Sequence, residues 1–171
     1  MALSKINTGG LAADAVDNTI LDLADNFAFT GTVTGAGSVL QVVEAVNNTN
    51  FSSTSTSFVD AGMDVTITPS STSSKILILG SINLGSASNG LAVIGTIYAD
   101  DTTNLGDSTN GLARHDDTGQ GATNHSVIAL HSASTTSAVK YSVYTKQSGG
   151  GTHHFNFNNA ESTLIAMEIA G

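Results

Sequence analysis

The chain has 171 residues, of which 40% are hydrophobic and only 11% are charged, and 14 acids against 5 bases give a net charge of −9. A surface that binds nucleic acid or an anionic membrane needs clustered lysine and arginine, and these few bases are spread along the whole chain. Without cysteine, disulfides and zinc–thiolate sites are excluded, and the most apolar block, Ile76–Leu79, is far shorter than the roughly 20 residues of a membrane helix.

Residues 1–37 are too poor in apolar side chains to build a core and are interpreted as an arm. A weak apolar stripe with aspartates on the other side makes this region the only helix candidate. A helix this short is marginal alone, so we expect it to be ordered by another chain; the alternative is a floppy terminus. The residues expected to make arm contacts are Leu11, Val16, Ile20 and Leu23. Gly31, Gly35 and Gly37 then indicate an extended linker.

From Ser38 onward, short strands are separated by turns rich in serine, threonine, asparagine and glycine. The apolar run Val39–Val46 predicts a strand buried on both faces. In the next long strand, Val65 and Ile67 are expected to face the core, and Pro69 ends it. Further strands are expected over residues 75–83, 91–99, 125–132, 138–146, 153–158 and 163–170, the last with Ile165, Met167 and Ile169 on one face.

This pattern of about eight or nine strands without intervening helices predicts an all-β fold. We expect an antiparallel β-sandwich, a jelly-roll-like head, over residues 38–171, carried on an extended, partly helical N-terminal arm over residues 1–37. The edges of a sandwich need protection, and few charges are available to protect these. Packing of the sheets against sister subunits would solve this problem.

Residues 100–124 show little periodicity and are expected to form a long polar loop, which in a compact domain is often functional. Oxygen-rich loops can bind calcium, but the EF-hand spacing is not matched, and a solvated loop is the preferred interpretation. Recognition of a receptor or a glycan is the other interpretation. The residues expected to face such a receptor are Asp100, Asp101, Asn104, Asp107, Arg114 and His115.

Catalytic motifs are not found: there is no nucleophile elbow, no zinc-protease motif and no phosphate loop. Neighbours in a strand point to opposite faces, so His153 and His154 cannot both bind one ion, although copies of one histidine could share an ion at a threefold axis. His125 and His131 share a strand face but lie about 20 Å apart. We therefore expect a protein that is not an enzyme and that holds no metal ion and no cofactor.

Four stretches carry a resemblance to a known class of proteins. The opening Leu3-Ser4-Lys5-Ile6-Asn7-Thr8 and the later Phe29-Thr30-Gly31-Thr32-Val33-Thr34-Gly35 resemble N-terminal segments of fibre and virion structural proteins of tailed bacteriophages. The block Pro69-Ser70-Ser71-Thr72-Ser73-Ser74-Lys75-Ile76-Leu77 and the ending Met167-Glu168-Ile169-Ala170 are similar to a module of marine phages.

The resemblance implies a structural component of a phage virion, made in the host cytoplasm. Its expected role is that of a tail fibre, head fibre or capsid decoration protein, a homotrimer assembled by inter-subunit sheet packing. Its expected partners are its own copies and, through residues 1–37, another virion protein. The alternative is an adhesin that binds a host surface or a glycan through the 100–124 loop, and neither nucleic-acid binding nor membrane insertion is expected.

Overall fold

A computed structural model describes residues 37–87, 90–116 and 121–171 of the chain. The predicted arm, with its expected contact residues Leu11, Val16, Ile20 and Leu23, lies outside this part. No helix within the described residues is long and apolar enough to span a membrane.

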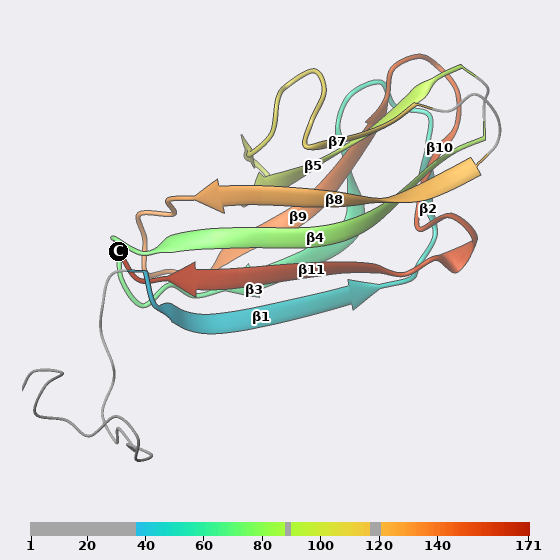
Figure 1. Cartoon of the computed structure of the whole chain (residues 1–171). Coiled ribbons are helices and arrows are strands. Elements are labelled where there is room, and N and C mark those ends of the chain that lie inside the picture. Colours follow the sequence, from blue (N-terminus) through green and yellow to red (C-terminus); the bar gives the residue numbers. More distant parts are fainter. Residues whose placement is uncertain (1–36, 88–89, 117–120) are drawn as a thin grey trace, which may run out of the picture. The chain divides into compact units, whose positions relative to one another are not determined.

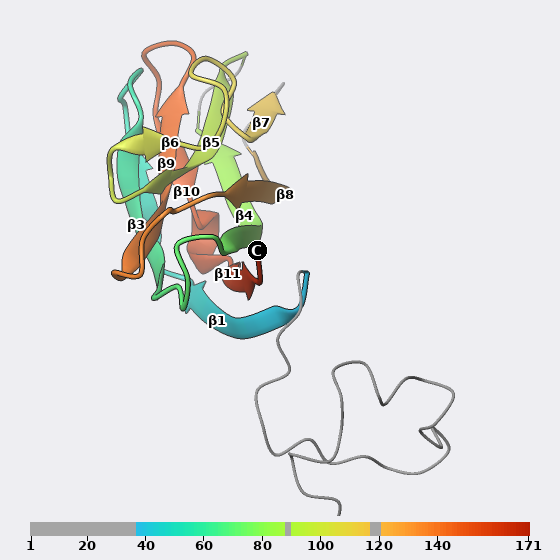
Figure 2. The same cartoon turned by 90° about the vertical axis from the view of Figure 1, so that its left-hand side faces the viewer.

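The described residues form two antiparallel sheets that pack face to face (Figures 1 and 2). The first sheet contains, in spatial order, β1 (Val39–Asn47), β11 (Ser162–Ile169), β4 (Lys75–Ser86) and β8 (Gly121–His131), and at one end of β4 it continues into β10 (His153–Phe155) and β2 (Phe51–Ser53). The second sheet contains β3 (Val59–Ile67), β9 (Val139–Gln147) and β5 (Ala92–Ala99), with β6 (Thr103–Asn104) and β7 (Ala113–Asp116) paired to β5. A 3₁₀ turn, η1 (Phe157–Asn159), precedes β11.

The connectivity of the long strands is that of a jelly roll. The four-strand order β1-β11-β4-β8 faces the order β3-β9-β5-β7, and every pairing is antiparallel. Eight strands arranged in this way as two sheets are the double Greek key of jelly-roll proteins. The predicted antiparallel, jelly-roll-like sandwich is confirmed.

The core lies between the sheets and is built from alternate residues of their strands. Met63, Val65 and Ile67 of β3 are at most 3% exposed, so the inward direction predicted for the last two is confirmed. Tyr141 of β9 and Phe155 of β10 are the largest fully buried side chains. Because both sheets are filled by β-branched, aliphatic and aromatic residues on their inner sides, each outer side is free to serve another purpose.

Two expectations about single segments are wrong. The run Val39–Val46 is not buried on both faces: Val42 and Val46 are 55% and 53% exposed, because β1 is an edge strand with the second sheet on one side only. The 100–124 segment is not one loop, since it contains β6, β7 and the start of β8. These strands are short and polar, so backbone pairing to β5 and β4 forms them without a hydrophobic period.

Candidate functional site

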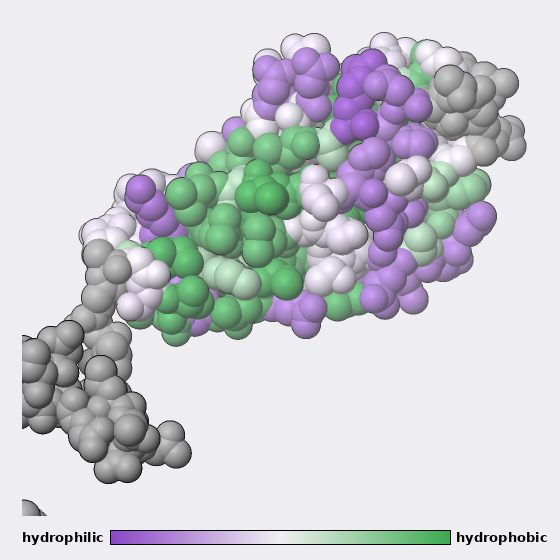
Figure 3. Space-filling view, viewed as in Figure 1, coloured by the Kyte–Doolittle hydropathy of each residue, from purple (hydrophilic) through white to green (hydrophobic). Residues whose placement is uncertain are grey.

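The feature that distinguishes this molecule is the outer face of the first sheet. Among the described residues, six large hydrophobic side chains are more than a third exposed, and all lie on β1 or β8: Val39, Leu40, Val42, Val46, Ile128 and Leu130. Ile128 and Leu130 are 63% and 59% exposed. Figure 3 shows the hydrophobic side chains gathered over one half of this face. Single exposed aliphatic residues are ordinary, but a contiguous patch marks an interaction site.

The strand registers join these side chains into rows across four strands. One row is Val42, Met167, Leu77 and Leu130, and the next is Glu44, Ile165, Leu79 and Ile128. The row after that is Val46, Thr163, Ser81 and Ser126. The members on β11 and β4 are half-buried or exposed, as is expected of outward positions flanked by neighbours. We call this surface, on β1, β11, β4 and β8, the outer face.

Strand β11 explains why the face is apolar. Ile165, Met167 and Ile169 share one face as predicted, but that face is the outer one. Ser162, Leu164, Ala166 and Glu168 are the fully buried positions of the strand. The strand therefore turns its larger apolar residues outward and a carboxylate inward, against the ordinary distribution of such residues.

Glu168 stays inside because its carboxylate is fully hydrogen-bonded. Oε1 accepts bonds from the backbone N–H and the hydroxyl of Ser70 at 2.7 and 2.6 Å, and Oε2 accepts a bond of 2.6 Å from Gln41 Nε2. Burial alone would raise the pKa of Glu168, but the bonds from Ser70 and Gln41 lower it to about 2. The buried charge thus fixes which face of β11 looks outward.

A shallow hollow lies within the outer face beside the two apolar rows. Its volume is about 270 Å³, and its rim includes Leu79, Ile128 and Ile165 together with Ser81, Ser126 and Thr163. Because these residues belong to β4, β8 and β11, the hollow crosses three strands. It has the size to receive a side chain of another molecule.

The four acidic or amide residues predicted for a receptor-facing loop hold turns within the domain. Asp100 Oδ1 accepts the backbone N–H of Lys140 at 2.9 Å, and Asp101 Oδ2 lies 2.6 Å from Lys140 Nζ. Asn104 Oδ1 accepts Thr96 Oγ1 at 2.6 Å. Asp107 Oδ1 accepts the N–H groups of Thr109 and Asn110 at 2.9 and 2.6 Å.

The electrostatics of these turns agree with a structural role. The hydrogen bond from Lys140 lowers the pKa of Asp101, and backbone bonds from Asn110 and Thr109 lower the pKa of Asp107. Among the residues that the structure describes, no three His, Asp or Glu side chains are grouped as metal ligands. The carboxylates of Asp101 and Asp107 are therefore already bonded to groups of their own chain.

Arg114 and His115, the two remaining predicted residues, lie on β7 and point in different directions. Arg114 forms an ion pair of 2.8 Å with Asp116 and borders a polar hollow of about 210 Å³ that Lys146 also lines. The ammonium of Lys146 donates to the Ser108 carbonyl at 3.0 Å. His115 Nδ1 lies 3.4 Å from Nε2 of His125 on β8, a pairing across the two sheets that the sequence does not predict. The structure therefore does not bring the six residues together as one site.

The paired histidines at the end of the chain alternate as predicted, but one of them is buried. His153 is fully buried, with Nε2 3.1 Å from Thr145 Oγ1, whereas His154 packs on the ring of Phe157 at the surface. Burial, and secondly the charge of His154, lowers the pKa of His153 to about 4. His153 therefore lies in the interior, whereas His154 lies at the surface.

We expect this burial to make the fold sensitive to mild acid. Between pH 6.5 and 4 the unfolded chain protonates His153 while the folded chain does not, so the free energy of unfolding falls by about 3 kcal/mol as the pH drops through that window. Urea unfolding at pH 7, 5.5 and 4.5 measures it, and His153→Gln should flatten the pH dependence. A pH dependence that is unchanged in His153→Gln would contradict this account.

Comparisons with known proteins give a likeness of overall structure only. No family model matches the chain, and no curated protein does. Among solved structures, a chain in the structure of the Gx strain of infectious bursal disease virus is similar to this chain. The identity is 17% and the TM-score 0.41, over 77% of this chain and 37% of that chain. A VP2 subviral particle of infectious bursal disease virus is similar at 17% identity and a TM-score of 0.40, over 87% of this chain and 43% of that chain. The chain thus spans about two fifths of these proteins, and identities and scores this low say nothing about function.

Proposed function

We propose that the protein is a structural component of a virus particle, built in through the outer face of its first sheet. The observation that carries the proposal is that face: rows of aliphatic side chains across four strands, with Ile128, Leu130, Val42 and Val46 each more than half exposed. An isolated soluble domain gains nothing from such a surface, whereas an assembling subunit buries it.

The fold and the sequence resemblance support the same proposal. Jelly rolls occur in viral capsid proteins and in lectins, so the fold permits the role without proving it. The N-terminal stretches, together with the Pro69–Leu77 block, resemble those of phage virion proteins. Within that class the role is an appendage or surface protein: a tail fibre, head fibre or decoration protein, with residues 1–37 docking on another virion protein.

The adhesin alternative has less support from the described residues. It needs free polar groups on the 100–116 segment, where Asp100, Asp101 and Asp107 already accept hydrogen bonds from their own chain. Arg114 is likewise paired with Asp116. The unusual feature of the exposed surface is the apolar outer face, and this feature agrees better with an assembly role.

The direct test is the protein composition of purified virus particles from a host in which this sequence is expressed. Quantitative mass spectrometry should find the chain in many copies per particle after a density gradient. Its absence from particles, with abundant chain in the surrounding lysate, would overturn the proposal. The lysate measured in parallel is the control for expression.

A further inference from the structure

We infer that the outer face binds the same face of a second copy of this chain, an inference that rests on the proposed function and names the partner. The area of the face fits such a contact. Leaving out Leu40, which lies at the bulge of β1, the other five exposed aliphatic side chains present on the order of 500 Å². A stable interface buries about 800 Å² per partner, of which roughly 60% is apolar, so this face supplies about the apolar share of one interface.

The charge of the molecule favours this face as the place where two copies meet. The chain carries a net charge of −9, so like-charged copies repel each other across most of their surface. At the described outward positions of the four strands, the only charged residues are Glu44 and Lys75. One acid and one base leave the face neutral, and the ion pairs within the described part of the chain involve neither of them.

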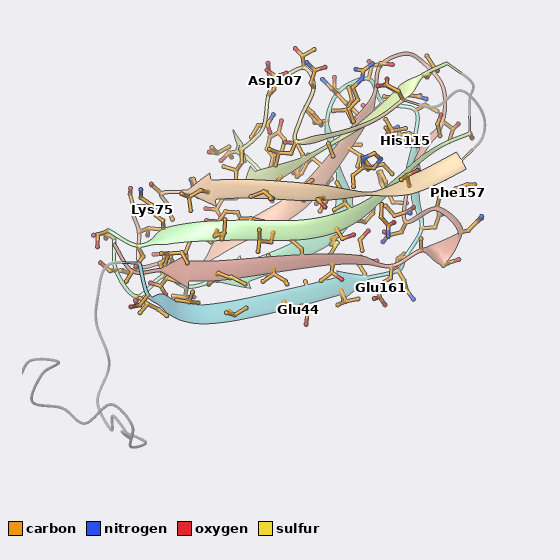
Figure 4. All side chains as sticks on the ribbon, in the orientation of Figure 1. Glu44, Lys75, Asp107, His115, Phe157 and Glu161 are labelled. Atoms are coloured by element: carbon orange, nitrogen blue, oxygen red, sulfur yellow. The ribbon has the colours of Figure 1, made fainter. Side chains whose placement is uncertain are left out.

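The acid and the base lie on opposite sides of the centre of the face. Glu44 is opposite Ile165 of β11, and Lys75 is opposite Ile169, so Met167 lies midway between them in both directions. Figure 4 shows Glu44 on β1 and Lys75 at the end of β4. With strands about 4.8 Å apart and about 3.3 Å per residue, the two charges are roughly 16 Å apart and each is about 8 Å from the centre.

Two copies can stack face to face with Met167, the centre of the face, over Met167 of the other copy. When a two-fold axis in the contact plane relates the copies, the charges of Glu44 and Lys75 come together. Glu44 of each copy then lies over Lys75 of the other, which makes two equivalent ion pairs at the rim. On the same flat lattice the strands of the two copies cross at roughly 70°, within the range of orthogonal sheet packing. A two-fold contact of one surface with itself closes at two copies.

The same arrangement also places a protruding side chain of one copy over a hollow of the other. The two-fold operation carries Leu130 of one copy over the hollow bordered by Leu79, Ile128 and Ile165 of the other. Leu130 is 59% exposed, and the hollow holds about 270 Å³. One surface thus provides both a protruding aliphatic side chain and the recess that accepts it, twice over by symmetry.

The test is a charge exchange in the full-length protein, read as the dimer dissociation constant by sedimentation equilibrium in low salt. Glu44→Lys and Lys75→Glu should each weaken the dimer at least tenfold, because each places like charges opposite one another at two sites. The double variant Glu44→Lys with Lys75→Glu should recover most of the lost affinity, and added salt should shrink all these differences. Glu161→Lys, at an exposed position just before β11, makes the same change of net charge as Glu44→Lys but outside the face, and it should leave the constant unchanged.

Three results would overturn the inference. If neither Glu44→Lys nor Lys75→Glu changes the dissociation constant of the dimer, the contact lies elsewhere. A double variant as weak as the single variants means that the two residues do not meet. A monomeric full-length chain means that another occupant, such as residues 1–36, covers the face. If one of these results is obtained but the chain is found in particles, the inferred contact fails and the proposed function stands. If the double variant restores the dimer but the chain is absent from particles, the proposed function fails and the contact stands.

Discussion

Replacing Ile128 and Leu130 together by aspartate is expected to convert the assembled protein into folded monomers. Both side chains are about 60% exposed in the single chain, so the fold should lose little stability. In the contact they become buried, and each unpaired carboxylate left in an apolar interface costs several kcal/mol. The dissociation constant should rise by more than a thousandfold, measured by sedimentation equilibrium with the urea midpoint as the check on folding.

The matched control adds the same two charges on the other sheet. Thr103 and Ser108 are exposed positions on or beside β6, away from the first sheet, and Thr103→Asp with Ser108→Asp should leave the assembly unchanged. If this pair dissociates the protein as strongly as the β8 pair does, net charge governs assembly and the outer face does not. If the β8 pair unfolds the chain, single Leu130→Ala, which only empties the proposed hollow, replaces it as the test.

Replacing Glu168 by alanine is expected to cost the fold about 3 kcal/mol. The carboxylate is buried and accepts bonds from Ser70 and Gln41, and hydrogen bonds to a charged group contribute about 1.5–3 kcal/mol each. Without it the Ser70 N–H and the Gln41 amide lose a partner. Urea unfolding at pH 7 measures the loss, and Glu161→Ala, at an exposed position just before β11, should change stability by less than about 0.5 kcal/mol.

The same carboxylate sets a second, acid-dependent loss. The folded pKa of about 2 lies below the ordinary glutamate value of 4.5, so the contribution of Glu168 is fully present above pH 4.5 and disappears as the pH falls from 4.5 to 2. Glu168→Ala should therefore unfold with a weaker pH dependence in that window than the unmodified chain. Equal pH dependence in the two proteins would show that folding does not lower the pKa of Glu168, and the explanation of the orientation of β11 would fail.

The sequence predicted the architecture because local alternation carried the information. Val65 and Ile67 point inward as their spacing required, and turn residues separated the strands correctly enough to give a sandwich. It did not predict which face of β11 is buried. Ile165, Met167 and Ile169 form a better apolar set than Leu164 and Ala166, and only the bonds of Glu168 to residues 98 and 127 positions away reverse the choice.

The candidate site was harder to predict for a related reason. Local spacing identified the acids near residue 100, yet tertiary partners such as Lys140 and Ser142, some 40 residues along the chain, decide that they hold turns. The outer face did have a signal. Ile76–Leu79 and Val127–Leu130 are apolar at successive positions, and a strand in a two-layer sandwich buries only one side of such a run. The excess on the other side is the surface that we propose for assembly.

The mass of the purified full-length protein in solution tests the central claim most directly. Light scattering across a concentration series should give twice the chain mass of 17.3 kDa, because a face that binds its own copy closes at two. A mass of three chains would favour the trimer that the phage resemblance implies and contradict the face-to-face contact. A mass of one chain at every concentration would contradict self-assembly through the outer face altogether.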